Sequence, residues 1–200
     1  EGGLKILDVS NPTNPSLVGS YDTTGRAFDV EVVGNYAYVA DYYESGLQII
    51  DISNPTNPSL AASYDTSGLA EGVEVVGNYA YVADGGAGLQ IINISNPTAP
   101  SLVGSYDTTG EALEVAVVGN YAYVAAYSGL QIINISNPTA PILAASYDTS
   151  SYAEGVEVVG NYAYVADFEG GLKILDVSDF IPSISLSVTP ASVTENSTIT

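Results

Sequence analysis

Carboxylates are the side chains of this sequence that could do chemistry. The 200 residues include 23 Asp and Glu against 3 Lys and Arg, which gives a formal net charge of −20. Two carboxylates about 5 to 10 Å apart can hydrolyse a glycosidic bond. The candidates lie beside one recurring apolar strand and are Asp29, Glu31, Glu71, Glu74, Glu111, Glu114, Glu154 and Glu157. Because acids recur at near-equivalent positions, they indicate a charged rim rather than one tuned pair, and we expect no catalytic residues.

The residue types that are missing exclude several classes of function. The chain has no His, Cys, Met or Trp, so thiolate nucleophiles, His-based triads, ordinary zinc sites and disulfides are excluded. With three basic residues there is no phosphate-binding surface, and nucleic acid would be repelled. No run of about 18 apolar residues is present, so no membrane insertion through a helix is expected.

Calcium is the ion that an oxygen-only set of ligands suits best. Loops that follow a recurring strand carry the calcium candidates Asp41, Glu44, Asp84, Asp167 and Glu169. Ala126 occupies the corresponding position of another repeat, and no EF-hand pattern is present. The pattern favours solvated acidic loops, so we expect no cofactor, with calcium as the alternative.

The segments Asp22-Thr23-Thr24-Gly25 and Asp65-Thr66-Ser67-Gly68 resemble the aspartic-protease signature. That chemistry requires two facing carboxylates that share a proton. Here the motif recurs four times, with its aspartates at positions 22, 65, 107 and 148. The repetition favours a turn in which Asp bonds its own backbone.

Tyrosines and Asn sequons are the remaining binding or modification candidates. Tyr pairs such as Tyr36 and Tyr38 alternate along a strand in every repeat, which favours packing between sheets. Aromatic residues that vary between repeats are better ligand contacts; these are Tyr42, Tyr43, Tyr127 and Phe168. Sequons occur at Asn93, Asn134 and Asn196, and Asn196 is the glycosylation candidate because its surroundings are polar.

Internal repetition predicts the fold that must position these residues. The string GNYAYVA begins at Gly34, Gly77, Gly119 and Gly160, that is, every 41 to 43 residues. Each repeat reads as four short strands separated by Gly-Asn, Gly-rich and Asn-Pro turns. Strands such as 47–52 are apolar on both faces, as strands covered on both sides are. We therefore predict an all-β propeller of four four-stranded blades of about 42 residues, plus a C-terminal extra strand.

The repeated sequence GLQIIDISNPTNPSLAASYDTSG, followed by VEVVGNYAYVAD, resembles the LVIVD repeat. This repeat is found in secreted and cell-surface proteins of bacteria and archaea. The resemblance covers residues 3–178 and implies a β-propeller on an extracellular or cell-surface protein. It supplies no catalytic motif.

The strands at the two ends do not match one blade. The N-terminus supplies two strands of a blade and the C-terminus supplies three, and residues 1–10 are identical to residues 169–178. Four blades could close within the chain and leave one copy to pair elsewhere, the chain could be part of a larger ring of six to eight blades, or the surplus strand could enter a neighbouring subunit. The apolar residues of the first assembly strand candidate are Leu4, Ile6 and Leu7.

The repeat stops after Ser178, which divides the chain into a propeller domain of residues 1–178 and a segment of residues 179–200. Residues 183–189 alternate polar and apolar side chains, as one-faced strands do; the apolar ones are Ile184, Leu186 and Val188. This segment is either a linker into an Ig-like or Calx-beta-like module or an assembly strand for a neighbouring subunit.

These patterns favour a non-catalytic extracellular structural protein that self-associates by strand addition into a filament, surface layer or adhesive scaffold. The alternative is a glycan- or protein-binding propeller module of a larger surface protein.

Overall fold

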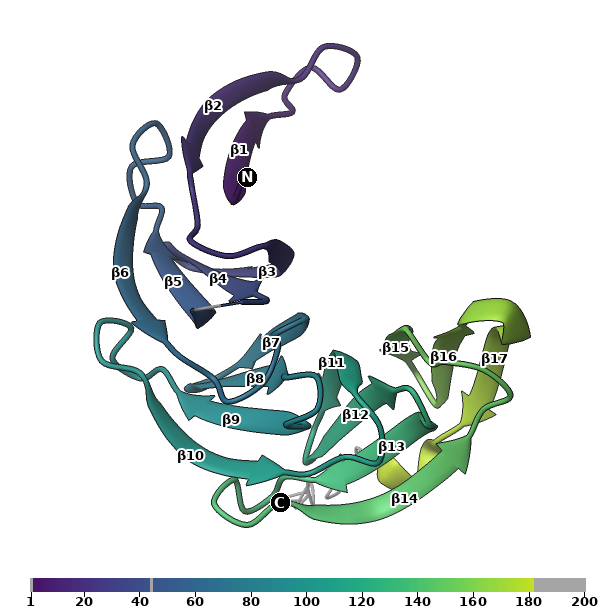
Figure 1. Ribbon diagram of the computed structural model, residues 1–200. Helices are drawn as coiled ribbons and strands as arrows, with labels where there is room; N and C mark the ends of the chain where they lie inside the picture. Colours follow the sequence, from purple (N-terminus) through teal and green to yellow (C-terminus); the bar gives the residue numbers. More distant parts are fainter. Residues whose placement is uncertain (1, 44, 182–200) are drawn as a thin grey trace, which may run out of the picture.

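The chain folds into antiparallel sheets that follow one another in an arc (Figure 1). The computed structural model describes residues 2–43 and 45–181, in which there are seventeen strands and two short 3-10 helices. Three sheets have four strands each. The first consists of β3 Ala27–Val33, β4 Tyr36–Asp41, β5 Gly46–Asp51 and β6 Ser59–Tyr64, and the second of β7 Gly72–Val76, β8 Tyr79–Ala83, β9 Leu89–Asn93 and β10 Ser101–Tyr106. The third consists of β11 Ala112–Val118, β12 Tyr121–Ala126, β13 Gly129–Asn134 and β14 Ile142–Asp148.

Incomplete sheets form the two ends of the arc. At one end β1 Leu4–Asp8 pairs with β2 Ser16–Tyr21. At the other end β15 Gly155–Val159, β16 Tyr162–Asp167 and β17 Gly171–Asp176 form a three-stranded sheet. The 3-10 helices are η1 Phe168–Gly170, before β17, and η2 Ser178–Phe180, after it. Among the described residues, no helix is long and apolar enough to cross a bilayer.

The Gly-Asn turns join the first two strands of each four-stranded repeat. Gly34, Gly77, Gly119 and Gly160 have φ of 58° to 61°. Val33 and Tyr36 face each other across the first of these two-residue turns. A glycine with positive φ at the first turn position is typical of the type II′ hairpin, whose twist matches that of the flanking strands.

The core lies between neighbouring sheets. One face of β4 and β5 packs on the next sheet, where Tyr38, Ala40, Leu47 and Ile49 meet Val82 and its neighbours. The same arrangement recurs at the following two junctions. The packing role predicted for the repeated tyrosines is thus confirmed for Tyr38, Tyr81 and Tyr123, which are all buried.

The predicted all-β repeat architecture is confirmed, but the arc is not closed. Three complete four-stranded sheets are present, and the fourth predicted blade is divided, as predicted, into two strands at the N-terminal end and three at the C-terminal end. Figure 1 shows the end sheets separated by a gap. The predicted strand at 183–189 lies outside the described residues.

Candidate functional site

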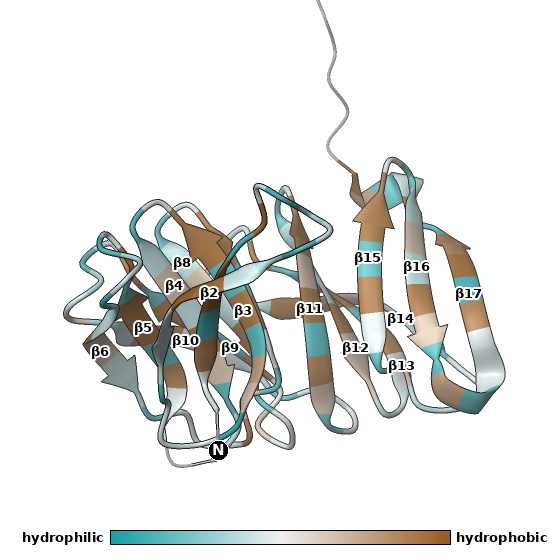
Figure 2. Cartoon of the chain, turned by 90° about the horizontal axis from the view of Figure 1, so that it is seen from above, coloured by the Kyte–Doolittle hydropathy of each residue, from teal (hydrophilic) through white to brown (hydrophobic). Residues whose placement is uncertain are grey.

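The three-stranded end sheet leaves an apolar face uncovered. Leu172 and Ile174 on β17 are 65% and 57% exposed. The residues at the same positions of β5, Leu47 and Ile49, are fully buried against the next sheet. Apolar segments of β15 and β17 are visible at this end of the arc in Figure 2. In the part of the chain that the structure describes, no further sheet packs on β17, so the face that every internal sheet buries is open to solvent.

The two-stranded end is the counterpart of that face. Val30 and Val32 of β3 are 45% and 53% exposed, whereas the equivalent Val73 and Val75 of β7 pack into the first junction between sheets. The end sheet of β1 and β2 lacks the two inner strands that would cover these valines. A pocket lies between β1 and β3, and its walls are Gly3, Leu4, Lys5, Ala27, Phe28, Asp29, Val30 and Val39. The pocket occupies the place that the two inner strands of a complete sheet would fill.

The predicted assembly residues of β1 have different surroundings. Leu4 is buried and Ile6 half-buried, and both pack on Ala37, Val39 and Ile50 of the next sheet. Leu7 is 52% exposed. The remaining predicted residues lie outside the described part of the chain; they are Ile184, Leu186 and Val188.

The buried aspartates at the ends of β4, β8 and β16 hold the connections between sheets. Asp84 accepts hydrogen bonds from Thr66 Oγ1 and, at 2.8 Å, from the backbone N–H of Gly68. Both donors belong to the loop that leads from β6 to β7. Asp41 accepts in the same way from the Gly25 N–H, at 2.8 Å. These carboxylates therefore bind the D-T-T/S-G loops of the chain itself.

The third repeat holds the corresponding loop between sheets without an acid. Ala126 stands where the other repeats have Asp41, Asp84 and Asp167. The loop is held instead by its Thr109 carbonyl, which accepts hydrogen bonds from Ser128 Oγ and, at 3.0 Å, from Gln131 Nε2.

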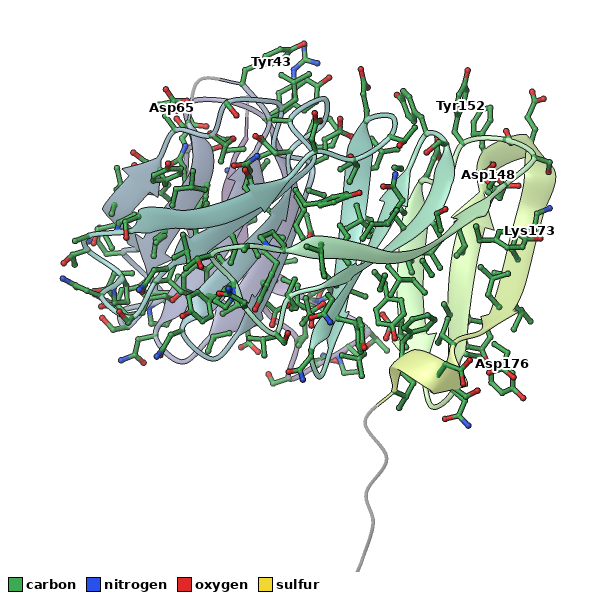
Figure 3. The ribbon with its side chains drawn as sticks, turned by 90° about the horizontal axis from the view of Figure 1, so that it is seen from below. Tyr43, Asp65, Asp148, Tyr152, Lys173 and Asp176 are labelled. Carbon is green, nitrogen blue, oxygen red and sulfur yellow. The ribbon has the colours of Figure 1, made fainter. Side chains whose placement is uncertain are left out.

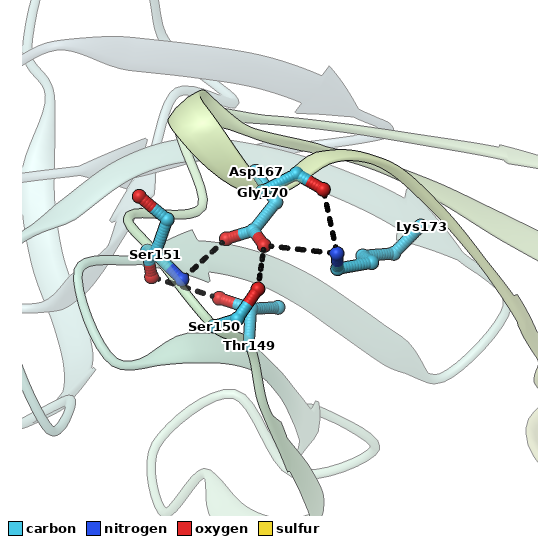
Figure 4. Close-up of polar contacts among 6 residues, drawn as sticks. All are labelled: Thr149, Ser150, Ser151, Asp167, Gly170 and Lys173. Carbon is cyan, nitrogen blue, oxygen red and sulfur yellow. Dashed lines mark hydrogen bonds and ion pairs between the residues drawn. The ribbon is translucent and has the colours of Figure 1, made fainter.

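Lys173 contacts and stabilises Asp167, the buried aspartate at the end of β16 (Figure 4). The Lys173 Nζ lies 3.4 Å from Asp167 Oδ2 and donates to the Gly170 carbonyl. Ser150 Oγ and the Ser151 N–H donate to the same carboxylate, each at 3.2 Å. Burial raises the pKa of Asp167, but the bonds from the Thr149 and Ser150 hydroxyls, from Lys173 and from the Ser151 N–H outweigh burial and hold the pKa below its usual value. The lysine replaces Gln48, Gln90 and Gln131 of the internal repeats.

The calcium candidates do not gather into one site. Asp41 and Asp167 end strands of two different sheets, Asp84 directly follows β8 of a third, and Glu169 lies in η1. Glu44 lies outside the described residues. In residues 2–43 and 45–181, no group of three acidic side chains is arranged to hold a metal ion.

The acids of the innermost strands connect neighbouring sheets. The two carboxylate oxygens of Asp29 accept from the Val30 N–H of its own strand and the Val73 N–H of β7, each at 2.8 Å. Glu71 and Glu114 line one pocket with Phe28, Asp29, Leu113, Tyr127 and Glu154. Burial, together with the charge of Glu111, raises the pKa of Glu71 to about 7. Burial, together with the charge of Asp29, does the same for Glu114.

These raised pKa values predict that acidification stabilises the fold. Between the ordinary pKa of 4.5 and about 7, Glu71 and Glu114 hold more protons in the folded state than in the unfolded state. The free energy of unfolding therefore falls as pH rises through that window. Thermal unfolding at pH 5 and pH 8 should show a higher Tm at pH 5, and the difference should shrink when Glu71→Gln and Glu114→Gln are combined. An equal difference in the variant would contradict the assignment.

Aromatic side chains gather at one rim of the arc, where Tyr43 and Tyr152 are labelled in Figure 3. Phe28 stacks on Tyr42 with ring centroids 4.7 Å apart. The ring centroid of Tyr152 lies 4.7 Å from that of Tyr127 and 6.3 Å from that of Phe168. Arg26 lies over the Tyr43 ring at 5.6 Å.

Four members of this aromatic group are predicted from the sequence, whereas Phe28 and Tyr152 are not. Both could have been found because they interrupt the repeat. Phe28 stands where the other repeats have Glu71, Leu113 and Glu154, and Tyr152 stands where they have Arg26, Leu69 and Glu111.

The turns predicted at the D-T-T/S-G motif are made differently. Within the described part of the chain, the carboxylates of Asp22, Asp65, Asp107 and Asp148 form no backbone hydrogen bond. Three of the threonines that follow them form bonds instead: Thr66 to Asp84, Thr108 to the Gly110 carbonyl and Thr149 to the Ser151 carbonyl. Aspartate and asparagine bond the backbone two residues ahead elsewhere, as in Asp51 to the Ser53 N–H. Asn93 and Asn134 of the sequons make such bonds at strand ends, and Asn196 lies outside the described residues.

Comparison with known proteins supports the repeat. The model of the LVIVD repeat matches five consecutive segments, residues 1–23, 24–66, 67–108, 109–149 and 150–187. No curated protein matches the chain.

Several solved structures are similar in fold. The crystal structure of the computationally designed Ika8 protein has a TM-score of 0.70 at 12% identity, over 88% of this chain and 52% of that one. The computationally designed Ika4 protein has a TM-score of 0.65 at 11% identity, over 78% of this chain and 94% of that one. A protein of unknown function from Desulfotomaculum acetoxidans gives 0.67 at 14% identity, over 85% and 61%. The chain thus spans about half of the Ika8 chain, and these likenesses show the fold alone.

Proposed function

Because the chain belongs to the LVIVD repeat family and folds as an open arc, we propose that it is a non-catalytic structural subunit joined head to tail to its neighbours. The C-terminal end sheet of one copy packs against the N-terminal end of the next. Repetition of this contact produces a ring or a filament, depending on whether the rotation closes.

The observation that carries the proposal is the match between the two ends. Leu172 and Ile174 form the same face that Leu47 and Ile49 bury at an internal junction, and Val30 and Val32 form the surface that Val73 and Val75 present there. These residues are therefore the exposed parts of a junction that the chain already builds three times. On the first sheet the rest of that junction, Ala37, Val39 and Ile50, is covered by Leu4 and Ile6 of β1. Exposed apolar patches of this kind mark association surfaces.

Unpaired strand edges support an extended assembly. Among the described residues, β17 pairs with β16 alone and β1 with β2 alone, so each end sheet has an unpaired edge, and such edges are templates for strand addition.

The proposed setting is extracellular, at the cell surface. The resemblance to the LVIVD repeat implies such a setting, and the absence of cysteine fits either compartment. The net charge of −20 keeps such an assembly soluble and repels anionic surfaces.

Molecular mass as a function of concentration tests the proposal. Light scattering of the purified chain should give a mass that rises above 20.6 kDa as the concentration approaches about 100 µM. A mass of one chain at every concentration would overturn the proposal. Negative-stain microscopy of the associated fraction then separates rings from filaments.

A second candidate function is ligand binding at the aromatic rim. The exposed Tyr127, Tyr152 and Phe168 group favours it, because aromatic rings on loops can stack on sugars or on a protein ligand. Binding to a glycan array that disappears with Tyr152→Ala, while the mass distribution stays unchanged, would support this candidate.

A further inference from the structure

Two strands at opposite ends of the arc have the same sequence. Residues 1–10 and 169–178 both read EGGLKILDVS. The first copy forms β1, which pairs with β2, and the second forms β17, which pairs with β16. In a complete sheet one strand at this position makes both pairings, as β5 does with β4 and β6.

The register shows that the two copies are interchangeable beside β2. Leu4 faces Tyr21, Lys5 faces Ser20 and Ile6 faces Gly19, followed by a bulge. The internal pair of β5 and β6 has the same register, with Leu47 facing Tyr64 and Gln48 facing Ser63. β17 offers β2 the same residues in the same order, so β2 cannot distinguish its own β1 from the β17 of another copy.

We propose that β17 of one copy takes the place of β1 beside β2 of the next copy, so that β15, β16 and β17 of the first chain and β2 of the second form one four-stranded sheet. This inference rests on the proposed head-to-tail assembly and names the strand that exchanges. Leu172 and Ile174 of the first copy then occupy the positions of Leu4 and Ile6, against Ala37, Val39 and Ile50 of the second.

The contacts of β1 and β17 indicate which of the two strands is more easily displaced from its sheet. β17 is anchored beyond its own length: Val177 is buried and its N–H donates to the Asn161 carbonyl at 2.8 Å. Phe180, just after it, contacts Tyr121 edge to face with ring centroids 5.4 Å apart. Val9, at the position equivalent to Val177, is 64% exposed. Displacing β1 therefore breaks fewer contacts than displacing β17.

The ionic contacts agree with this choice. Lys173 Nζ is already within 3.4 Å of Asp167 Oδ2, and the exchange leaves that pair in place. Lys5 is exposed and has no ion pair among the described residues, so its displacement with β1 breaks none.

Leu4 and Leu172 allow a matched test, because they occupy the same position of the two identical segments. Leu4→Asp weakens the hold of β1 on its own sheet and removes a competitor, so association of the full chain should tighten about tenfold. Leu172→Asp weakens the incoming strand, so association should weaken by at least that factor. Ile6→Asp and Ile174→Asp form a second pair, and circular dichroism checks the fold of every variant.

A synthetic EGGLKILDVS peptide completes the experiment. Added to the Leu4→Asp chain, the peptide should occupy the vacated place beside β2 and return the assembly to single chains. If the unaltered chain associates but Leu4→Asp weakens or does not change association, the exchange is wrong and the head-to-tail assembly stands. If the unaltered chain and the Leu4→Asp chain both remain single, the proposed function itself fails.

Discussion

Replacing Leu172 and Ile174 together by aspartate should abolish association without unfolding the chain. The two side chains are 65% and 57% exposed in the single chain, so surface carboxylates there cost little. In the assembly the same carboxylates would be buried without partners, which costs several kcal/mol. We expect the association constant to fall by at least about 100-fold, measured by sedimentation, with an unchanged circular dichroism spectrum.

The equivalent internal positions provide the control. Leu130 and Ile132 are 1% and 5% exposed, because the last sheet of the arc covers them. Leu130→Asp with Ile132→Asp should therefore unfold the chain, in contrast to the pair on β17. If the variant of Leu172 and Ile174 still associated like the unaltered chain, the exposed face of β17 would have no part in assembly.

Asp84→Ala should destabilise the fold more than any other single carboxylate substitution described above. The side chain is fully buried, and its loss leaves Thr66 Oγ1 and the Gly68 N–H without their acceptor. Hydrogen bonds to a buried charged group contribute about 1.5 to 3 kcal/mol each, and burial, which raises the pKa of Asp84, offsets part of that. We expect a loss of about 2 to 4 kcal/mol in the free energy of unfolding, measured by urea titration.

Asp65→Ala is the matched control for Asp84→Ala. Asp65 belongs to the same loop but is exposed, as Figure 3 shows at the rim, so its removal should change the free energy of unfolding by less than about 0.5 kcal/mol. Equal effects of the two substitutions would contradict the role assigned to Asp84. A stability that depends on added calcium in the unaltered chain, but not in Asp84→Ala, would restore the metal interpretation.

The repeated sequence made the sheets predictable, whereas the interactions between residues far apart in the sequence could not be predicted from it. Strings such as GNYAYVA locate the hairpins, and the strand order of the three central sheets follows from them. Whether the ends meet depends on the angle between successive sheets, which small differences at many side-chain contacts determine. Local sequence does not contain that angle.

The buried aspartates show the same limit at a single residue. In sequence, Asp84 is an acid beside a Gly-rich loop, a context that suits calcium as well as a turn. Its partners Thr66 and Gly68 come from the preceding repeat, so the bonding could be predicted only with the loop already placed. Asp29 is similar, because one of its two bonds goes to Val73 on the next sheet. In the sequence, Lys173 indicated its contact with Asp167, because a lysine that replaces a repeated glutamine near an acid indicates an ion pair.

The most direct test of head-to-tail assembly is to mix two variants, each damaged at one end. Val30→Asp with Val32→Asp damages the N-terminal end, and Leu172→Asp with Ile174→Asp damages the C-terminal end; all four side chains are exposed in the single chain. Sedimentation of each variant alone should give single chains. The mixture should give a one-to-one dimer and nothing larger, because it contains one intact junction. Single chains in the mixture, or self-association of either variant alone, would contradict head-to-tail assembly.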